Sequence, residues 1–136
     1  MLEQLKQLFE SLAEKSVKEE QGQLPDFIPN GERYMFSINW DNDTVSYETK
    51  WSPNIEEMKQ IADYYKTGFN YYYEELGNLV YGVVRYENGM LADTFLDTSD
   101  FNLFTENDND TWMFEVQTYE SEFDILEILL EKKQNN

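Results

Sequence analysis

The sequence of 136 residues contains no histidine and no cysteine. These absences exclude a Ser-His-Asp triad, a Cys-His pair, the usual His/Cys zinc sites and any disulfide framework. The six glycines are scattered along the chain, which also excludes a glycine-rich phosphate loop. We therefore expect no cofactor, and any catalysis would have to rely on carboxylates, tyrosine, lysine or a hard metal ion.

Basic residues are also scarce, because 10 lysines and arginines stand against 28 acids and leave a net charge of −18. No apolar run approaches membrane-spanning length, and the acid-containing N-terminus lacks the continuous apolar region of a signal peptide. These absences predict a cytoplasmic protein without a membrane segment. Hydrophobic residues nevertheless make up 40% of the chain, which is enough for the core of one domain over residues 1–136.

Residues 52–77 carry the clearest helical pattern, and we interpret the rest of the chain as strands and helices that cover its apolar face. Ser52 is a favourable N-cap, Pro53 suits the first helical position and Gly77 suits the C-cap. Gly68 costs roughly 1 kcal/mol in a helix interior, and we attribute it to close packing against a strand. The apolar stripe recurs every three or four residues and consists of Ile55, Met58, Ile61, Ala62, Tyr65, Phe69, Tyr72 and Leu76.

Periodicity also assigns the remaining elements. Two further helices are predicted, over residues 2–20 and after the N-cap Ser121, the second with Phe123, Leu126, Leu129 and Leu130 buried. Apolar residues predict strands over residues 34–40, 45–51, 79–86, 90–96 and 111–119. The order α-ββ-α-βββ-α predicts an α+β fold, in which an antiparallel sheet of about five strands has its helices packed largely on one face.

Particular turns and side chains refine this prediction. Asn88-Gly89 is the strongest hairpin signal, and the nearly continuous apolar strand before it is expected to be central in the sheet. In the first hairpin the apolar residues share one face, with Trp40 and Trp51 at its opposite ends. The polar stretch 97–109 is expected to pack on the core through Phe101, Leu103 and Phe104.

Half of the net negative charge lies between residues 96 and 124, which carry nine acids and no lysine or arginine. A surface of one sign attracts oppositely charged partners and repels nucleic acid, so this segment predicts a basic protein partner and no direct nucleic-acid binding. The simpler interpretation is that the charge serves solubility. The predicted partner-binding acids are Asp97, Asp100, Glu106, Asp108, Asp110, Glu120 and Glu122.

Tyr64 and Tyr71 lie seven residues apart, beside the buried stripe of the predicted central helix. Glu57 and Glu75 fall on a similar side of that helix. Tyrosine is enriched at binding hot spots, so the two rings are candidate anchors for a partner rich in arginine and lysine. The alternative is that they border the core and keep their hydroxyl groups in water.

Two oxygen-rich stretches, residues 41–44 and 107–110, are candidates for Ca²⁺ binding. Neither fits the EF-hand spacing, since a loop beginning at Glu106 has Thr111 in place of the required glycine and Gln117 in place of the final glutamate. Such residues are also typical of tight turns without a metal, which is the interpretation we prefer. Close carboxylates such as Asp97 and Asp100 are expected by chance in so acidic a chain, and we predict that the protein is not an enzyme.

Two classes of function remain. The first is a non-enzymatic acidic protein that neutralises a basic protein partner, most concretely a bacterial immunity protein that inhibits a toxin or nuclease. The alternative is a structural or assembly module, for example a homo-oligomer that pairs through a sheet edge or an aromatic surface. Ionic strength separates them, because binding through the acidic segment weakens as salt rises and an apolar self-interface does not.

Overall fold

The computed structural model describes residues 2–29, 31–50 and 52–135, and it divides into two compact units, Met1–Gly68 and Phe69–Asn136. Unit 1 contains α1 (Leu2–Glu19), β1 (Phe36–Asp41), β2 (Thr44–Glu48) and α2 (Ile55–Tyr65). Unit 2 contains β3 (Phe69–Glu75), a 3-10 turn η1 (Leu76–Asn78), β4 (Val80–Glu87), β5 (Met90–Phe95), α3 (Thr98–Phe101), β6 (Thr105–Glu106), β7 (Trp112–Phe114), β8 (Gln117–Tyr119) and α4 (Glu122–Gln134).

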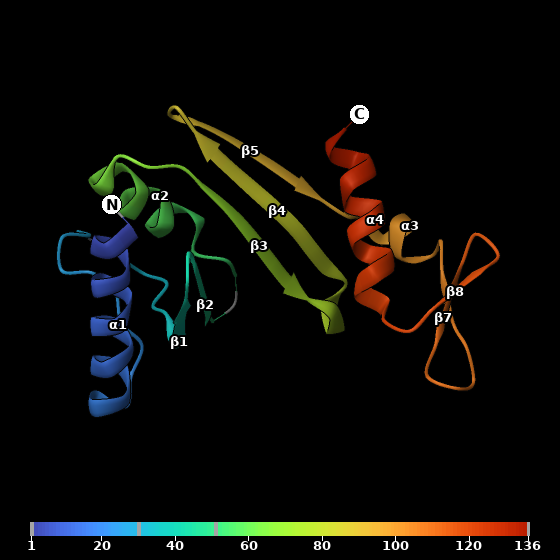
Figure 1. Cartoon of the computed structure of the whole chain (residues 1–136), viewed down its shortest axis with the longest axis horizontal. Coiled ribbons are helices and arrows are strands. Elements are labelled where there is room, and N and C mark those ends of the chain that lie inside the picture. The colour runs from blue at the N-terminus through green and yellow to red at the C-terminus, as the bar shows by residue number, and fades with distance from the viewer. Residues whose placement is uncertain (1, 30, 51, 136) are drawn as a thin grey trace. The chain divides into compact units, whose positions relative to one another are not determined.

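The α+β class and the antiparallel pairing predicted from the sequence are confirmed (Figure 1). The described strands, however, form separate sheets in the orders β1-β2, β3-β4-β5 and β6-β7-β8. The prediction of one sheet of about five strands is therefore wrong. Folding of the whole chain as one domain stays a prediction.

Unit 1 is built on the contact between α1 and the first hairpin. The rings of Phe9 on α1 and Trp40 on β1 are stacked with their centroids 5.8 Å apart, and Phe9 and Leu12 are buried. The register of the hairpin shifts between Phe36 and Asn39, where Ser37 has a φ of 51°. Such an irregularity re-aims the side chains before it. Met35, which directly precedes β1, is accordingly fully buried. Trp51 lies outside the described residues.

The prediction of one long helix over residues 52–77 is wrong, because α2 ends at Tyr65 and residues 69–75 form β3. Lys66 adopts a left-handed conformation with a φ of 55°, and the Thr67 N–H donates to the Ala62 carbonyl over 2.9 Å. This closure is a Schellman-type helix end. The aromatic run that follows favours a strand, and it pairs with β4 from Phe69 opposite Tyr86 to Glu75 opposite Val80.

The start of α2 also differs from the prediction, since its N-cap is Asn54 and not Ser52. Asn54 is completely buried, accepts a hydrogen bond from the Tyr47 hydroxyl at 2.6 Å and donates to the Arg33 carbonyl at 3.4 Å. Ser52 instead accepts a hydrogen bond from Arg33 Nε at 2.5 Å. Long-range polar contacts thus accompany a shift of the helix start by two residues.

In unit 2, β4 is the central strand of its sheet, as its nearly continuous apolar sequence predicted. The Asn88-Gly89 turn is confirmed, with φ values of 54° and 77° that are typical of a type I′ hairpin. Toward the other end of β4, the Tyr73 ring lies against Gly82, where any Cβ would clash. The Tyr73 hydroxyl donates to Asp93 Oδ1 at 2.8 Å, and burial together with Asp93 raises the pKa of Tyr73.

The strand predicted over residues 111–119 is divided into β7 and β8 by a tight turn. Glu115 and Val116 both have positive φ, 49° and 61°, as a two-residue type I′ hairpin turn requires. Val116 is fully exposed there. The preceding stretch packs on the core through Phe101 and Phe104 as predicted, whereas Leu103 is 57% exposed.

The core of unit 2 forms where α4 packs on the Tyr81 and Val83 side of the sheet. The predicted cap is confirmed, because Ser121 Oγ accepts a hydrogen bond from the Phe123 N–H at 3.2 Å. Phe123 itself is 40% exposed, which corrects its predicted burial. The buried cluster consists of Tyr81, Val83, Leu96, Phe101, Phe104, Phe114, Ile125, Leu126, Leu129 and Leu130.

Candidate functional site

Asp97 and Asp100, two of the predicted partner-binding acids, are engaged within unit 2. They form a capping box at α3, in which the Asp100 N–H donates to Asp97 Oδ1 at 3.1 Å and the Asp97 N–H donates to Asp100 Oδ2 at 2.8 Å. Lys133 of α4 ion-pairs with both carboxylates, at 3.3 Å and 2.5 Å. Hydrogen bonds from Ser99, the Asp100 N–H and Lys133 hold the pKa of Asp97 well below its usual range. These two acids therefore tie α3 to the end of α4.

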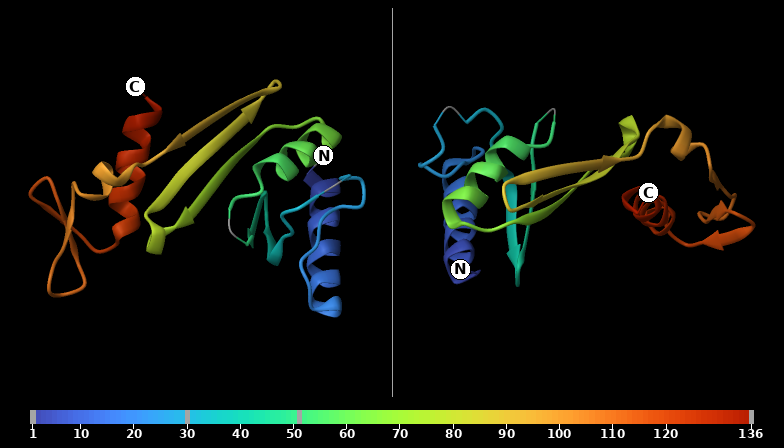
Figure 2. Two further views of the ribbon diagram at one scale, coloured as in Figure 1. Left: turned by 180° about the vertical axis from the view of Figure 1, so that it is seen from behind. Right: turned by 90° about the horizontal axis from the view of Figure 1, so that it is seen from above.

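The register of the β6-β7-β8 sheet gathers the other predicted acids at one place. Glu106 lies opposite Trp112, and Trp112 lies opposite Tyr119, so the end of β6, the start of β7 and the end of β8 coincide. The turn after β6 and the first residues of α4 extend from this same end, as Figures 1 and 2 show. We call this set the acidic end of unit 2: Glu106, Asp108, Asp110, Glu120 and Glu122.

The turn between β6 and β7, at the acidic end, is held by hydrogen bonds among its own residues. The Asn107 N–H donates to the Thr111 carbonyl at 2.8 Å, and the Thr111 hydroxyl donates to Asn109 Oδ1 at 2.6 Å. Asp108 and Asp110 are exposed around this closure. Among the described residues there is no group of three or more His, Cys, Asp or Glu placed to hold a metal ion.

No carboxylate of the acidic end forms an ion pair within the part of the chain that the structure describes. The two lysines near the C-terminus are used elsewhere. Lys132 lies 3.7 Å from Glu115 and over the Phe114 ring, and Lys133 binds the acids at α3. Partial burial, and then repulsion from Glu106, raise the pKa of Glu122. The acidic end is therefore a cluster of like charges without internal neutralisation.

The Glu122→Gln substitution is expected to raise the melting temperature near pH 7, because it removes a carboxylate whose ionised form is disfavoured in the folded state. A raised pKa means that ionisation costs stability above the folded pKa, and that this cost disappears as the pH falls through it. The gain should therefore shrink toward about pH 4. Melting curves of wild type, Glu122→Gln and the exposed neighbour variant Asp124→Asn across this range provide the measurement. A lower melting temperature for Glu122→Gln at pH 7 would contradict the assigned environment.

The two candidate tyrosine anchors do not share a helix face, which corrects the prediction. Tyr64 lies on the last turn of α2, is 60% exposed and stacks on Phe27 with ring centroids 3.9 Å apart. Tyr71 lies on β3 in the other unit, where it is partly buried between the rings of Phe69 and Tyr73. The predicted surface of acids and tyrosines on one long helix fails because that helix ends at Tyr65.

Glu57, predicted on the exposed side of the central helix, is only 4% exposed. Its Oε2 accepts hydrogen bonds from the N–H groups of Glu32 and Arg33 at 3.4 Å and 3.3 Å, which ties the preceding loop to α2. Its Oε1 is buried without a hydrogen-bond partner in the described residues. A signal existed, since Glu57 precedes the buried Ile61 by four residues and therefore shares its helix face.

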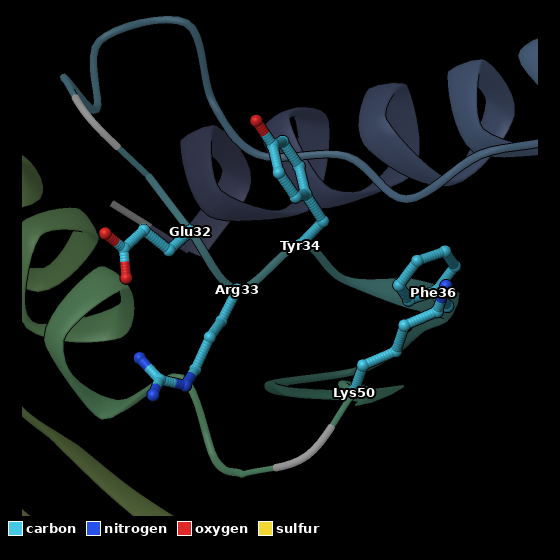
Figure 3. Close-up of a pocket in the computed structure, with 5 residues that line it drawn as sticks. All are labelled: Glu32, Arg33, Tyr34, Phe36 and Lys50. Atoms are coloured by element: carbon cyan, nitrogen blue, oxygen red, sulfur yellow. The ribbon is translucent and has the colours of Figure 1, made fainter.

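Unit 1 also has a hollow of about 330 Å³ that no sequence pattern predicted, lined by Glu32, Arg33, Tyr34, Phe36 and Lys50. Figure 3 shows that Arg33 extends toward the segment leading into α2, and that Lys50 lies beside Phe36. Lys50 Nζ is 5.2 Å from the centroid of the Phe36 ring. Two of the few cations of the chain thus line one hollow, in a different unit from the acidic end.

Residues 32–122 match the family described as the ferredoxin-like domain in Api92-like protein. The chain belongs to this family. The matched span includes all five carboxylates of the acidic end, and the ferredoxin-like description agrees with the mixture of helices and antiparallel sheets. Neither a curated protein nor a solved structure matches the chain. Within the described ranges, none of the helices combines the length and the apolar character needed to cross a membrane.

Proposed function

We propose that this protein is a non-enzymatic binding protein that neutralises a basic protein partner through the acidic end of unit 2. The observation that carries the proposal is the gathering of five carboxylates at one end of the β6-β7-β8 sheet. None of them has an ion-pair partner among the described residues. The same unit engages its two C-terminal lysines at other acids, so the acidic end keeps its full charge for a partner.

Electrostatics support this role in two ways. Repulsion between Glu106 and Glu122 opposes the folded state, and a lysine or arginine of a partner would relieve it on binding. A concentrated negative surface also accelerates encounter with a basic partner, by roughly 10- to 1000-fold at low salt. The most concrete form of the proposal is a cytoplasmic immunity-type inhibitor of a bacterial toxin or nuclease.

The test compares two variants that change the net charge equally. The acidic-end variant carries Glu106→Lys, Asp108→Lys and Asp110→Lys, and the control carries Glu3→Lys, Glu10→Lys and Glu14→Lys on the exposed side of α1. Each protein is immobilised, exposed to host lysate at low salt and eluted with a salt gradient. We expect wild type and control to retain one basic protein in a stoichiometric amount. We expect the acidic-end variant not to retain that protein.

Equal losses from both variants would contradict the proposal, because the effect would then follow net charge and not this surface. A smear of unrelated basic proteins on every column would contradict it as well. The acidic-end variant should also melt no lower than wild type, since these side chains make no ion pairs within the described residues. Unfolding of that variant would show that the acids are structural.

A structural or assembly role is the second candidate, and one observation favours it. Met90, Leu91 and Phe95 on β5 are 75%, 45% and 56% exposed, which is unusual for large apolar side chains on one short strand. An interface made by these residues would persist at high salt, unlike binding through the acidic end.

A further inference from the structure

The outer edge of β5 is a second candidate interaction surface, distinct from the acidic end. β5 is the last strand in the order β3-β4-β5, and Figure 1 shows it at the margin of that sheet. No described strand pairs with its outer side. The edge of a sheet presents free backbone N–H and C=O groups, which are a template for another strand.

The pairing of β4 with β5 shows which residues direct these groups outward. The Leu96 N–H donates to the Tyr81 carbonyl at 2.9 Å, so the backbone groups of Leu96 point toward β4. Hydrogen-bonding direction alternates along an antiparallel strand, which directs the backbone groups of Leu91, Asp93 and Phe95 away from β4. The Phe95 carbonyl accepts a hydrogen bond from Lys133 Nζ at 3.2 Å, which agrees with a carbonyl that does not pair with β4.

The side chains of the same three residues lie on one face, since alternate residues of a strand share a side. Leu91 and Phe95 are 45% and 56% exposed, and the exposed Asp93 lies between them. The Tyr73 hydroxyl donates to Asp93 Oδ1 at 2.8 Å and helps to hold that carboxylate in place. The edge thus presents the pattern apolar, acidic, apolar at every second residue.

We propose that the β5 edge binds an extended segment of another protein as an added antiparallel strand, with one basic residue between two apolar residues at alternate positions. The backbone of the segment would bond to Leu91 and Asp93, and its basic side chain would lie opposite Asp93. Opposite charges directly across a strand pair are favourable, and apolar pairs form on either side. This mode of recognition takes affinity from the main chain and specificity from alternate side chains.

A second copy of the chain fits this edge poorly. Twofold antiparallel pairing of the outward-facing residues Leu91, Asp93 and Phe95 is centred on Asp93, so the two Asp93 carboxylates would lie opposite each other. Like charges in this position are destabilising. Each copy also carries a net charge of −18. Asp93 therefore discriminates against self-pairing and in favour of a basic segment.

The test uses a capped heptapeptide, Thr-Val-Thr-Lys-Thr-Val-Thr, and its counterpart with glutamate in place of lysine. Amide chemical shifts and hydrogen exchange of the full chain are measured by NMR during titration. We expect the lysine peptide, at millimolar concentration, to shift and protect the amides of Leu91 and Asp93, and the glutamate peptide to bind about fivefold more weakly. The absence of shifts at these amides, or equal binding of both peptides, would overturn the proposal.

Two variants separate backbone pairing from side-chain contact. Leu91→Pro removes an outward-facing backbone N–H, whereas Leu91→Thr keeps it. We expect Leu91→Pro to weaken binding of the lysine peptide about tenfold more than Leu91→Thr does. Equal binding to both variants would overturn the proposal. Asp93→Lys is expected to reverse the preference toward the glutamate peptide, and an unchanged preference would overturn it too.

A control without peptide addresses self-association. Concentration-dependent shifts at Leu91 and Asp93 would assign the edge to a second copy and overturn the choice of partner. Since the acidic end is not involved, failure here would leave the lysate experiment with the charge-reversal variants unaffected, and the two proposals can fail separately.

Discussion

Replacing Ile125 with alanine is expected to lower the free energy of unfolding by about 3 kcal/mol, because a large-to-small change in a core loses transfer free energy and leaves a cavity. Ile125 is completely buried in the cluster that joins α4 to the sheet of unit 2. The measurement is chemical denaturation of wild type and variant, with the midpoint and slope fitted for each.

The matched control is Phe123→Ala, two residues earlier on the same helix. Its ring is 40% exposed and lies 6.4 Å from that of Tyr81, so the expected loss is only about 1 kcal/mol. The helical pattern of the sequence places Phe123 in the buried stripe and leaves Ile125 out of it. A larger loss for Phe123→Ala than for Ile125→Ala would therefore contradict the assignment of Ile125, and not Phe123, to the buried side of α4.

Replacing Glu57 with alanine is also expected to lower the free energy of unfolding, by about 2–4 kcal/mol. The substitution removes the carboxylate that accepts hydrogen bonds from the Glu32 and Arg33 N–H groups. It also leaves an empty space beside α2, because the Glu57 side chain is only 4% exposed. These hydrogen bonds are partly buried, so donors left without their acceptor lose part of their stabilisation. Thermal and chemical denaturation measure the loss, and Glu57→Gln should lose less because its amide oxygen remains an acceptor.

Glu56→Ala supplies the control at the neighbouring position. Glu56 lies in the same first turn of α2 but is exposed, so only its interaction with the helix dipole is lost, about 0.5 kcal/mol. Similar losses for the two variants would mean that the buried carboxylate does not hold the loop to α2.

Features that depend on a few adjacent residues could be predicted from the sequence. The first helix, the Asn88-Gly89 hairpin, the central position of β4 and the Ser121 cap were all confirmed. Each depends on local hydrophobic periodicity, turn geometry or capping, which operate over one or two turns of chain. The absence of histidine and cysteine likewise limits the available chemistry independently of the fold.

The end of α2 could not be predicted in this way, because residues 66–77 suit two structures. Phe69, Tyr72 and Leu76 continue a helical stripe, while Phe69, Tyr71 and Tyr73 alternate as a strand does. Pairing with β4 decides the matter by supplying backbone hydrogen bonds along the whole length of β3. This outcome also separates the two tyrosines that the sequence had placed together.

The acidic segment shows the same division between local composition and tertiary structure. Its composition alone established the excess of negative charge and the absence of basic residues within it. The tertiary structure decided which acids are neutralised, since Lys133 reaches Asp97 and Asp100 from 33 or more residues away while the strand register brings Glu106 near Glu122. Charge is a property of residues, but its pairing depends on contacts between segments distant in sequence, and only the fold creates these contacts.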